Sequence, residues 1–325
     1  MSVTFYFARH GETQFNLAKK VQGWTDSPLS AWGVHSAYML GQGLAAVDFV
    51  AACVSDADRA KNTLSLALES RENERVRLAR DTSMLMSPIL PDDCFFPDTA
   101  GGDEKAHAES MAAYLRARGC LAPDSLVPDS SNTPVSEIKR LKKAERWRPD
   151  AAELPDLEYP TWLLRTPPMK ARVGRPIPIS VDTRLREWCF GDLEGQPTMK
   201  LRNRLYDLFG DDLPREQQNR RIDEIADYLA RHDRSRRTEN FRTISTRIAS
   251  FIDDCGSSVQ REGGGNVLVV THAMFIRALV FMFAEPNDDE PSRIANGSVT
   301  KVVWDSGAVT VETVGDTSHL HGLGH

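Results

Sequence analysis

Two apolar runs stand near opposite ends of the chain, and a histidine follows each of them. Residues 3–8 and 266–271 are rich in β-branched and aromatic side chains, which is typical of buried strands. His10 comes shortly after the first run, and His272 comes directly after the second. In open α/β sheets, ligands bind beyond the carboxyl ends of the parallel strands. The pattern therefore predicts two histidines at strand ends, where ligands are bound in such folds.

The rest of the pattern alternates further strands with helices. In the stretch 215–231 the apolar residues recur at i, i+3, i+4 and i+7, which marks one buried helix face. Ser30 is a suitable N-cap for the first long helix. Helices are expected at residues 30–46, from near 58, and at 198–209, 215–231, 239–259 and 274–283, and strands at 49–54, 177–181, 298–304 and 308–314. This alternation favours an α/β protein.

Composition narrows the class of protein. The 325 residues are 41% hydrophobic and 26% charged, as in an ordinary globular protein. A formal charge of -6 and a pI near 5.8 argue against general binding to nucleic acid or to an anionic membrane. No apolar run reaches the roughly 20 residues of a membrane span. The first strand begins too early for a cleavable signal peptide, so a cytoplasmic location is expected.

The cysteines give no sign of a cofactor or metal. They are odd in number and scattered, and none has Cys-x-x-Cys spacing: Cys53, Cys94, Cys120, Cys189 and Cys255. We therefore expect reduced thiols, with neither a disulfide framework nor a zinc site. No other metal cluster is evident, so we expect no metal and no cofactor.

The first histidine belongs to the run Arg9-His10-Gly11-Glu12-Thr13, with Asn16 shortly after it. Four more blocks follow: Gln22-Gly23 with Asp26-Ser27-Pro28-Leu29-Ser30 and Gly33; Ser55 and Arg59-Ala60 with Thr63; Leu185-Arg186-Glu187 with Phe190-Gly191 and Glu194-Gly195; and Thr271-His272-Ala273. In this order the blocks resemble the histidine phosphatase superfamily, also called the phosphoglycerate mutase-like family. The resemblance covers roughly the first seventy residues, an island near 180–196 and the last sixty.

The resemblance implies a fold and a domain organisation. The expected fold is a three-layer α/β/α sandwich with a mostly parallel central sheet, which holds both histidines at one edge. We expect one histidine phosphatase domain over residues 1–325. It would carry a large insertion at about 71–178, which is longer than the corresponding segment of most relatives, and a helical cap region at about 197–260.

The insertion is rich in proline, which forbids long uninterrupted elements. Two helical pieces are expected within it, at about 103–118 and 135–147. Basic residues cluster in the second piece, where they favour a solvated helix face over a surface that steers substrate. The insertion would act as a cap over the active-site mouth or form a partly mobile excursion.

The resemblance also assigns roles that suit phosphoryl transfer. Arg9 and Arg59 offer planar paired donors for phosphate, and His272 would donate a further hydrogen bond. His10 would be the nucleophile, since neighbouring guanidinium charges lower the pKa of an imidazole and keep its lone pair free. A phosphohistidine intermediate would result. Further phosphate or substrate contacts are implied for Asn16, Gln22, Gly23 and the backbone N–H of Ala273.

A proton donor is needed for the leaving group, and Glu187 is the candidate for it. It would act first as general acid and then as general base. Other carboxylates in the motifs could do the same: Glu12, Asp26, Asp192 and Glu194. The resemblance favours Glu187, because the acid of the family stands four residues before the glycine that is Gly191 here.

Three functions are open to such a site. Mutases of the family carry Leu-x-Gly-Leu-Asn-Lys after the acid, where this chain has Leu193-Glu194-Gly195-Gln196-Pro197. This difference favours a phosphatase that acts on a small phosphorylated metabolite and releases inorganic phosphate. A phosphoglycerate mutase-type phosphotransferase is the alternative, and a non-catalytic phospholigand-binding protein ranks below both.

Overall fold

The chain divides into two compact units. One is formed by Met1–Glu74 with Pro168–His325, and the other by Arg75–Pro167. The computed structural model describes residues 2–83, 177–210, 213–285 and 290–320. Nearly all of the second unit lies outside these residues, and so do the two helical pieces expected in the insertion. The insertion and the single-domain organisation therefore stay predictions, while the sheet and both histidines belong to the first unit.

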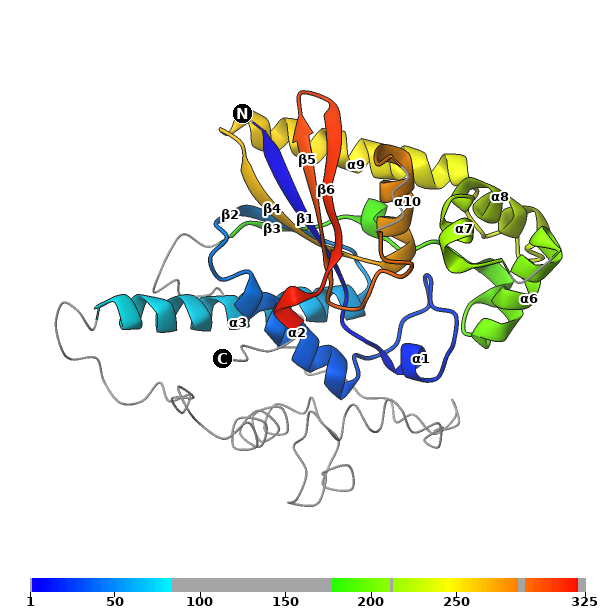
Figure 1. The fold of residues 1–325 in the computed structure, drawn as a ribbon, viewed down its shortest axis with the longest axis horizontal. Coiled ribbons are helices and arrows are strands. Elements are labelled where there is room, and N and C mark those ends of the chain that lie inside the picture. Colours follow the sequence, from blue (N-terminus) through cyan, green and yellow to red (C-terminus); the bar gives the residue numbers. More distant parts are fainter. Residues whose placement is uncertain (1, 84–176, 211–212, 286–289, 321–325) are drawn as a thin grey trace, which may run out of the picture. The chain divides into compact units, whose positions relative to one another are not determined.

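The described strands form one six-stranded sheet in which β1 lies between strands from the C-terminal part of the chain (Figure 1). In spatial order they are β3 (Ile179–Val181), β2 (Phe49–Val54), β4 (Gly265–Thr271), β1 (Val3–Arg9), β5 (Val299–Asp305) and β6 (Ala308–Asp316). The pairs β3–β2, β2–β4 and β4–β1 run parallel, whereas β5 is antiparallel to both β1 and β6. The expected mostly parallel sheet is confirmed, and its antiparallel part is the C-terminal hairpin.

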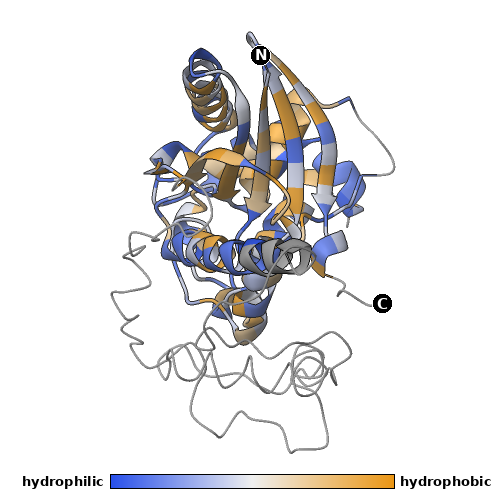
Figure 2. Cartoon of the chain, turned by 90° about the vertical axis from the view of Figure 1, so that its left-hand side faces the viewer, coloured by the Kyte–Doolittle hydropathy of each residue, from blue (hydrophilic) through white to orange (hydrophobic). Residues whose placement is uncertain are grey.

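The helices of the described part are α1 (Gln14–Leu17), α2 (Ala31–Gly43), α3 (Asp58–Ser83), α6 (Thr198–Phe209), α7 (Arg215–Asn219), α8 (Ile222–His232), α9 (Phe241–Arg261) and α10 (Ala273–Phe283), with short 3₁₀ turns η2 (Thr183–Leu185), η3 (Gly191–Leu193) and η4 (Ser318–Leu320). Strand residues alternate between two faces. Phe5 and Phe7 pack with α9 and α10, while Tyr6 and Ala8 pack with α2 and α3. Apolar residues gather on the strands between these helices (Figure 2). The three-layer α/β/α sandwich is confirmed.

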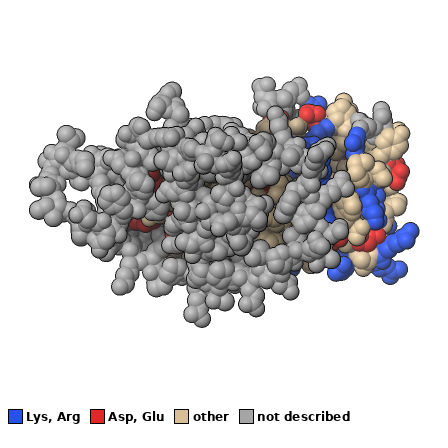
Figure 3. All heavy atoms as spheres, turned by 90° about the horizontal axis from the view of Figure 1, so that it is seen from below, with Lys and Arg blue, Asp and Glu red and all other residues tan. Residues whose placement is uncertain are grey.

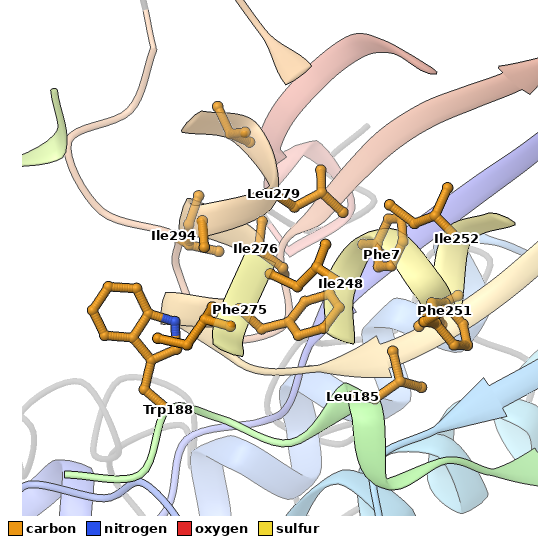
Figure 4. Packing of buried hydrophobic residues seen from close by; sticks show 14 of the residues in the cluster. Phe7, Leu185, Trp188, Ile248, Phe251, Ile252, Phe275, Ile276, Leu279 and Ile294 are labelled. Atoms are coloured by element: carbon orange, nitrogen blue, oxygen red, sulfur yellow. The ribbon is translucent and has the colours of Figure 1, made fainter. Parts of the chain in front are cut away.

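The larger apolar cluster also anchors the segment that carries Glu187. Leu185 and Trp188, on either side of it, are buried in this cluster with Phe275 of α10 (Figure 4). The ring centroid of Phe275 lies 6.0 Å from that of Phe7. Burying a large apolar side chain contributes about 1.5–3 kcal/mol to folding. The backbone around Glu187 is thus fixed on both sides by core packing.

The helix predicted over residues 215–231 is two helices, so that prediction was wrong in one respect. The chain leaves helical geometry at Arg221, whose φ and ψ are -129° and 36°. The apolar residues at helical spacing all lie in α8, which buries Ile222, Ile225, Ala226 and Leu229. Residues 215–219 have no buried face, so the pattern supports a helix only from Ile222 onward.

The first long helix begins as predicted, because the Ser30 hydroxyl accepts a hydrogen bond from Gly33 N at 3.0 Å. Its glycines weaken helix propensity, but two of them allow close packing. A Cβ on Gly33 would lie 1.9 Å from the Glu12 carbonyl oxygen, and one on Gly41 would lie 2.0 Å from that of Ala67. The close approach of α2 to the segment before α1 and to α3 therefore requires glycine at both positions.

The helices of the predicted cap region differ in where they lie relative to the sheet. Among the helices of the predicted cap region, α9 packs on the sheet itself, whereas α6–α8 lie at one end of it. In the view from below, that end shows lysine and arginine side chains next to aspartate and glutamate side chains (Figure 3). A capping role of this region stays a prediction. Within the described residues, no helix combines the length and apolar character needed to cross a bilayer.

Candidate active site

The parallel register of β1 and β4 brings the two strand-end histidines together. Arg9 is paired with Thr271 at the carboxyl ends of the two strands, and His10 N donates to Thr271 O at 2.9 Å. The ring centroids of His10 and His272 are 5.1 Å apart. The two rings are close because β1 and β4 pair, and the sequence alone could not establish that pairing.

His10 is held in one tautomer. Its Nδ1 lies 2.8 Å from the carbonyl oxygen of Gly11, which can only accept, so Nδ1 carries the proton. Burial, and then the charges of Arg59 and Arg9, hold the pKa of His10 well below its ordinary value of 6.5. At neutral pH the ring is therefore uncharged, with its lone pair on Nε2.

His272 has partners at both ring nitrogens. Nδ1 accepts from Nη2 of Arg59 at 3.0 Å, so Nε2 carries the proton and donates to Ser55 Oγ at 2.8 Å. Burial is the main cause that lowers the pKa of His272 well below 6.5, followed by Arg59 and His10. Ser55 is fully buried at the end of β2 and was missing from the predicted site residues.

Arg59 lies in the first turn of α3, as predicted, with 1% of its surface exposed. Its Nη1 donates to Asp26 Oδ1 at 2.8 Å and to Thr25 O, and its Nη2 donates to Gly23 O at 2.7 Å. Asp26 also accepts from the backbone N–H groups of Asp58 and Arg59. This carboxylate offsets the unfavourable position of a cation at a helix N-terminus.

Arg9, the last residue of β1, is the second arginine whose charge acts on His10. Its Nη1 donates to Ile294 O at 2.7 Å, and burial lowers the pKa of Arg9 to about 10, so it remains charged at neutral pH. The Nε–H groups of Arg9 and Arg59 are both buried and have no hydrogen-bond partner in the described structure. Unpaired buried donors are costly, and guanidinium donors suit anions. The two arginines therefore offer unsatisfied donors to a buried anion.

Glu187 is held at the N-terminus of α10. Its carboxylate accepts from the backbone N–H groups of Trp188, Met274 and Phe275, each at 3.0 Å. Burial raises the pKa of Glu187, while these backbone bonds and the charges of Arg59 and Arg9 oppose the rise. A carboxyl with a raised pKa holds its proton more readily than an ordinary one, which suits a general acid–base group.

Arg247 of α9 supports the backbone next to Glu187. Its Nη1 donates to the carbonyl oxygens of Arg184 and Arg186, both at 2.7 Å, and its Nη2 donates to Glu187 O at 3.2 Å. An ion pair with Glu239 at 2.9 Å holds the guanidinium in place. Only its place on an amphipathic helix is visible from the sequence.

A pocket of about 240 Å³ opens beside Glu187 and His272. The other residues that line it are Gly23, Trp24, Asp26, Asp56, Ala57, Asp58 and Arg186. Glu187 thus lines this pocket and also interacts electrostatically with both arginines. Within the described residues, no three His, Cys, Asp or Glu side chains gather in a way that would hold a metal ion.

Three of the four predicted accessory residues are engaged in hydrogen bonds within the protein. Asn16 Oδ1 accepts from Thr13 N in a capping box of α1. Gln22 accepts from the Thr13 hydroxyl and donates to Ser27. Gly23 N donates to Glu194. Ala273 is the first residue of α10, directly after His272. Their binding roles stay predictions.

The other candidate carboxylates are engaged in hydrogen bonds or ion pairs within the protein. Glu12 accepts from the Ser30 hydroxyl, and Asp192 pairs with Arg204 at 2.9 Å. Glu194 accepts from the backbone N–H groups of Gly23, Trp24, Thr25 and Phe190, which joins the loop before α2 to the segment of Glu187. Asp26 holds Arg59. Glu187 is thus the candidate whose carboxyl lines the pocket and interacts electrostatically with both arginines.

Comparison with known proteins gives matches over most of the described part. A family model described as the histidine phosphatase superfamily (branch 1) matches residues 5–81 and 165–317. The 2,3-bisphosphoglycerate-dependent phosphoglycerate mutase of Afipia carboxidovorans is 48% identical over 63 residues, which are 19% of this chain and 30% of that protein. The chain thus spans less than a third of the length of this curated relative.

Solved structures resemble the chain over more of its length. Phosphoglycerate mutase from Bacillus anthracis str. Sterne matches with a TM-score of 0.62 and 25% identity, covering 98% of this chain and 95% of that chain. A mycobacterial glucosyl-3-phosphoglycerate phosphatase with VO3 has a TM-score of 0.50 and 15% identity, with coverage of 97% and 100%. The latter likeness concerns the fold alone.

Proposed function

The chain belongs to the histidine phosphatase superfamily, and from this premise we propose that it hydrolyses a small phosphate monoester through a phosphohistidine on His10. The observation that carries the proposal is the pair of buried, unpartnered Nε–H groups of Arg9 and Arg59. They stand beside an imidazole whose lone pair is on Nε2. A phosphoryl group would satisfy both donors within reach of that nucleophile.

In the first half-reaction, His10 Nε2 attacks phosphorus and the bond to the ester oxygen breaks. Glu187 gives its proton to the departing alkoxide, which leaves as the alcohol. Arg9 and Arg59 compensate the charge on the equatorial oxygens. The products of this step are the alcohol and N-phosphorylated His10.

In the second half-reaction, ionised Glu187 takes a proton from water, whose oxygen attacks phosphorus. The bond to His10 Nε2 breaks, and inorganic phosphate is released. His272 contributes if Arg59 Nη2, which donates to its Nδ1 at 3.0 Å, turns to the phosphoryl group and the ring proton moves to Nδ1, from which it can donate to a phosphate oxygen. The Ser55 hydroxyl can then donate to the Nε2 that it now accepts from, so it supports both tautomers.

A mutase is the second candidate, because the Afipia carboxidovorans relative and the Bacillus anthracis structure are phosphoglycerate mutases by name. The sequence Leu193-Glu194-Gly195-Gln196-Pro197 argues against it, since family mutases have a different block there. Glu194 is moreover occupied with backbone N–H groups. We therefore favour hydrolysis of a small metabolite ester, with a cytoplasmic location as a prediction of the sequence.

Release of phosphate from p-nitrophenyl phosphate tests the proposal. His10→Ala should abolish turnover with an unchanged circular dichroism spectrum. His232→Ala is a matched control, since His232 is exposed at the end of α8 and its ring contacts Tyr228 of the same helix. Unchanged turnover in His10→Ala would eliminate the mechanism. Rapid formation of 2-phosphoglycerate from 3-phosphoglycerate with 2,3-bisphosphoglycerate would identify a mutase instead.

A further inference from the structure

The outer wall of the pocket beside Glu187 is acidic. Asp26, Asp56 and Asp58 line it, and Arg186 is the one lysine or arginine among its described lining residues. Glu187 is the proposed proton donor to the ester oxygen, so the alcohol portion of the substrate extends into this pocket. The chemistry of the wall therefore bears directly on which alcohol can leave.

Arg186 is held within the wall by Asp56 and Trp24. Its Nε donates to Asp56 Oδ1 at 2.8 Å and its Nη2 donates to Asp56 Oδ2, so the two side chains form a bidentate pair. Its guanidinium also stacks on the ring of Trp24, with Cζ 4.8 Å from the centroid. Hydrogen bonding to Arg186 lowers the pKa of Asp56, which is ionised at neutral pH. The cation of the wall is thus neutralised within the wall.

Asp58 adds a second carboxylate at the pocket rim. It pairs with Lys61 one turn along α3 at 2.7 Å, but more than half of its side chain remains exposed. Trp24, half exposed, supplies a flat apolar surface, and its Nε1 donates to Glu187 O. The described wall therefore presents acceptors and an aromatic ring to an occupant.

We infer that Asp58, by its charge, and Asp56, by neutralising Arg186, select the leaving group, favouring uncharged or cationic hydroxylated alcohols over alcohols that carry a carboxylate or a second phosphate. The inference rests on the proposed phosphatase function and narrows its substrate class. Like charges at a few ångströms repel, and interfaces commonly reject a wrong partner through such contacts. The inner arginines bind the phosphoryl group of either kind of ester, so discrimination falls to the outer wall.

Two esters with the same carbon skeleton test this selection. Glycerol 3-phosphate and 3-phosphoglycerate differ by a hydroxymethyl group in place of a carboxylate. We expect kcat/KM to favour glycerol 3-phosphate by about tenfold or more, the size of one close repulsion. Asp56→Asn removes a charge and releases Arg186, so the ratio should shrink by about tenfold. Asp58→Asn should shrink it by about threefold.

Asp305→Asn is the matched control for the change in net charge. Asp305 stands at the β5–β6 turn, next to Trp304, which pairs with Val3 at the opposite end of β1 from His10. This variant should leave the ratio of the two esters as it is. A ratio that shifts equally in all three variants would overturn the local origin of the selection.

Binding to the His10→Ala variant separates this inference from the proposed function. Calorimetric titration should give a Kd for glycerol 3-phosphate that is about tenfold lower than that for 3-phosphoglycerate. Equal affinities, tighter binding of 3-phosphoglycerate, or a ratio unchanged by Asp56→Asn would overturn the inference. The expected binding ratio without any hydrolysis by the unmodified protein would instead contradict the phosphatase proposal and leave the charge selection standing.

Discussion

Replacing Ser55 with alanine removes the hydroxyl that holds His272. Ser55 Oγ accepts from His272 Nε2 at 2.8 Å, and both side chains are fully buried. Alanine leaves that N–H without an acceptor and without access to water. An unsatisfied buried donor costs about 1–3 kcal/mol, so we expect the free energy of unfolding to fall by this amount.

The same change should lower activity, because Ser55 supports His272 in either tautomer. If the transition state loses about 1–3 kcal/mol of stabilisation because His272 is less well oriented, kcat/KM falls about 5- to 150-fold. Urea denaturation and hydrolysis of p-nitrophenyl phosphate measure the two effects. The same kcat/KM in Ser55→Ala as in the unmodified protein would refute the positioning role.

Ser70→Ala separates stability from catalysis. Ser70 is also buried, and its hydroxyl donates to Tyr38 O at 2.7 Å, within the packing of α3 on α2. This variant should lose a similar part of the unfolding free energy and keep its kcat/KM. If both serine variants lost activity in proportion to stability, the fall in Ser55→Ala would have no specific origin in His272.

Other perturbations address the remaining groups. Glu187→Gln should lower kcat by about 100-fold or more for alkyl phosphates, and less for p-nitrophenyl phosphate, whose leaving group needs little help from an acid; an equal loss on both ester classes contradicts the acid role. Nitrogen NMR of the imidazoles should find His10 neutral at pH 6.5 and protonated on Nδ1, because burial, Arg59 and Arg9 lower its pKa; a charged ring or a proton on Nε2 at that pH opposes this assignment. Gly33→Ala should cost about 1–3 kcal/mol of unfolding free energy, since the new Cβ would lie 1.9 Å from Glu12 O; an unchanged denaturation midpoint would show that the close approach is not needed.

Local patterns were enough to predict most of the described helices and strands, whereas the three-layer arrangement came from the resemblance. The strand expected at residues 49–54 and the helix expected at 198–209 have those bounds in the structure. Ser30 could be identified as a cap because its signal lies within a few residues. The break at Arg221 was not predicted, since polar residues without a buried face fit a helix and a turn equally well.

The site was predictable where a motif marked it and not where tertiary contacts made it. The convergence of His10 and His272 depends on strand pairing, and the motif resemblance pointed to it. Ser55 stands in a quoted motif block, but its contact with His272, 217 residues away, is a tertiary one. Arg247 supports Glu187 across 60 residues, and no motif marks it. The engagement of Gly23 N by Glu194 likewise depends on how two distant loops meet.

Chemical trapping of the phosphorylated protein tests the central claim most directly. After rapid alkaline quenching during turnover of an excess of p-nitrophenyl phosphate, digestion and mass spectrometry locate the phosphoryl group. We predict an acid-labile, base-stable phosphoryl group on the peptide that contains His10, and none in His10→Ala. A phosphoryl group on His272 or on a carboxylate, with His10 unmodified during full turnover, would contradict the account.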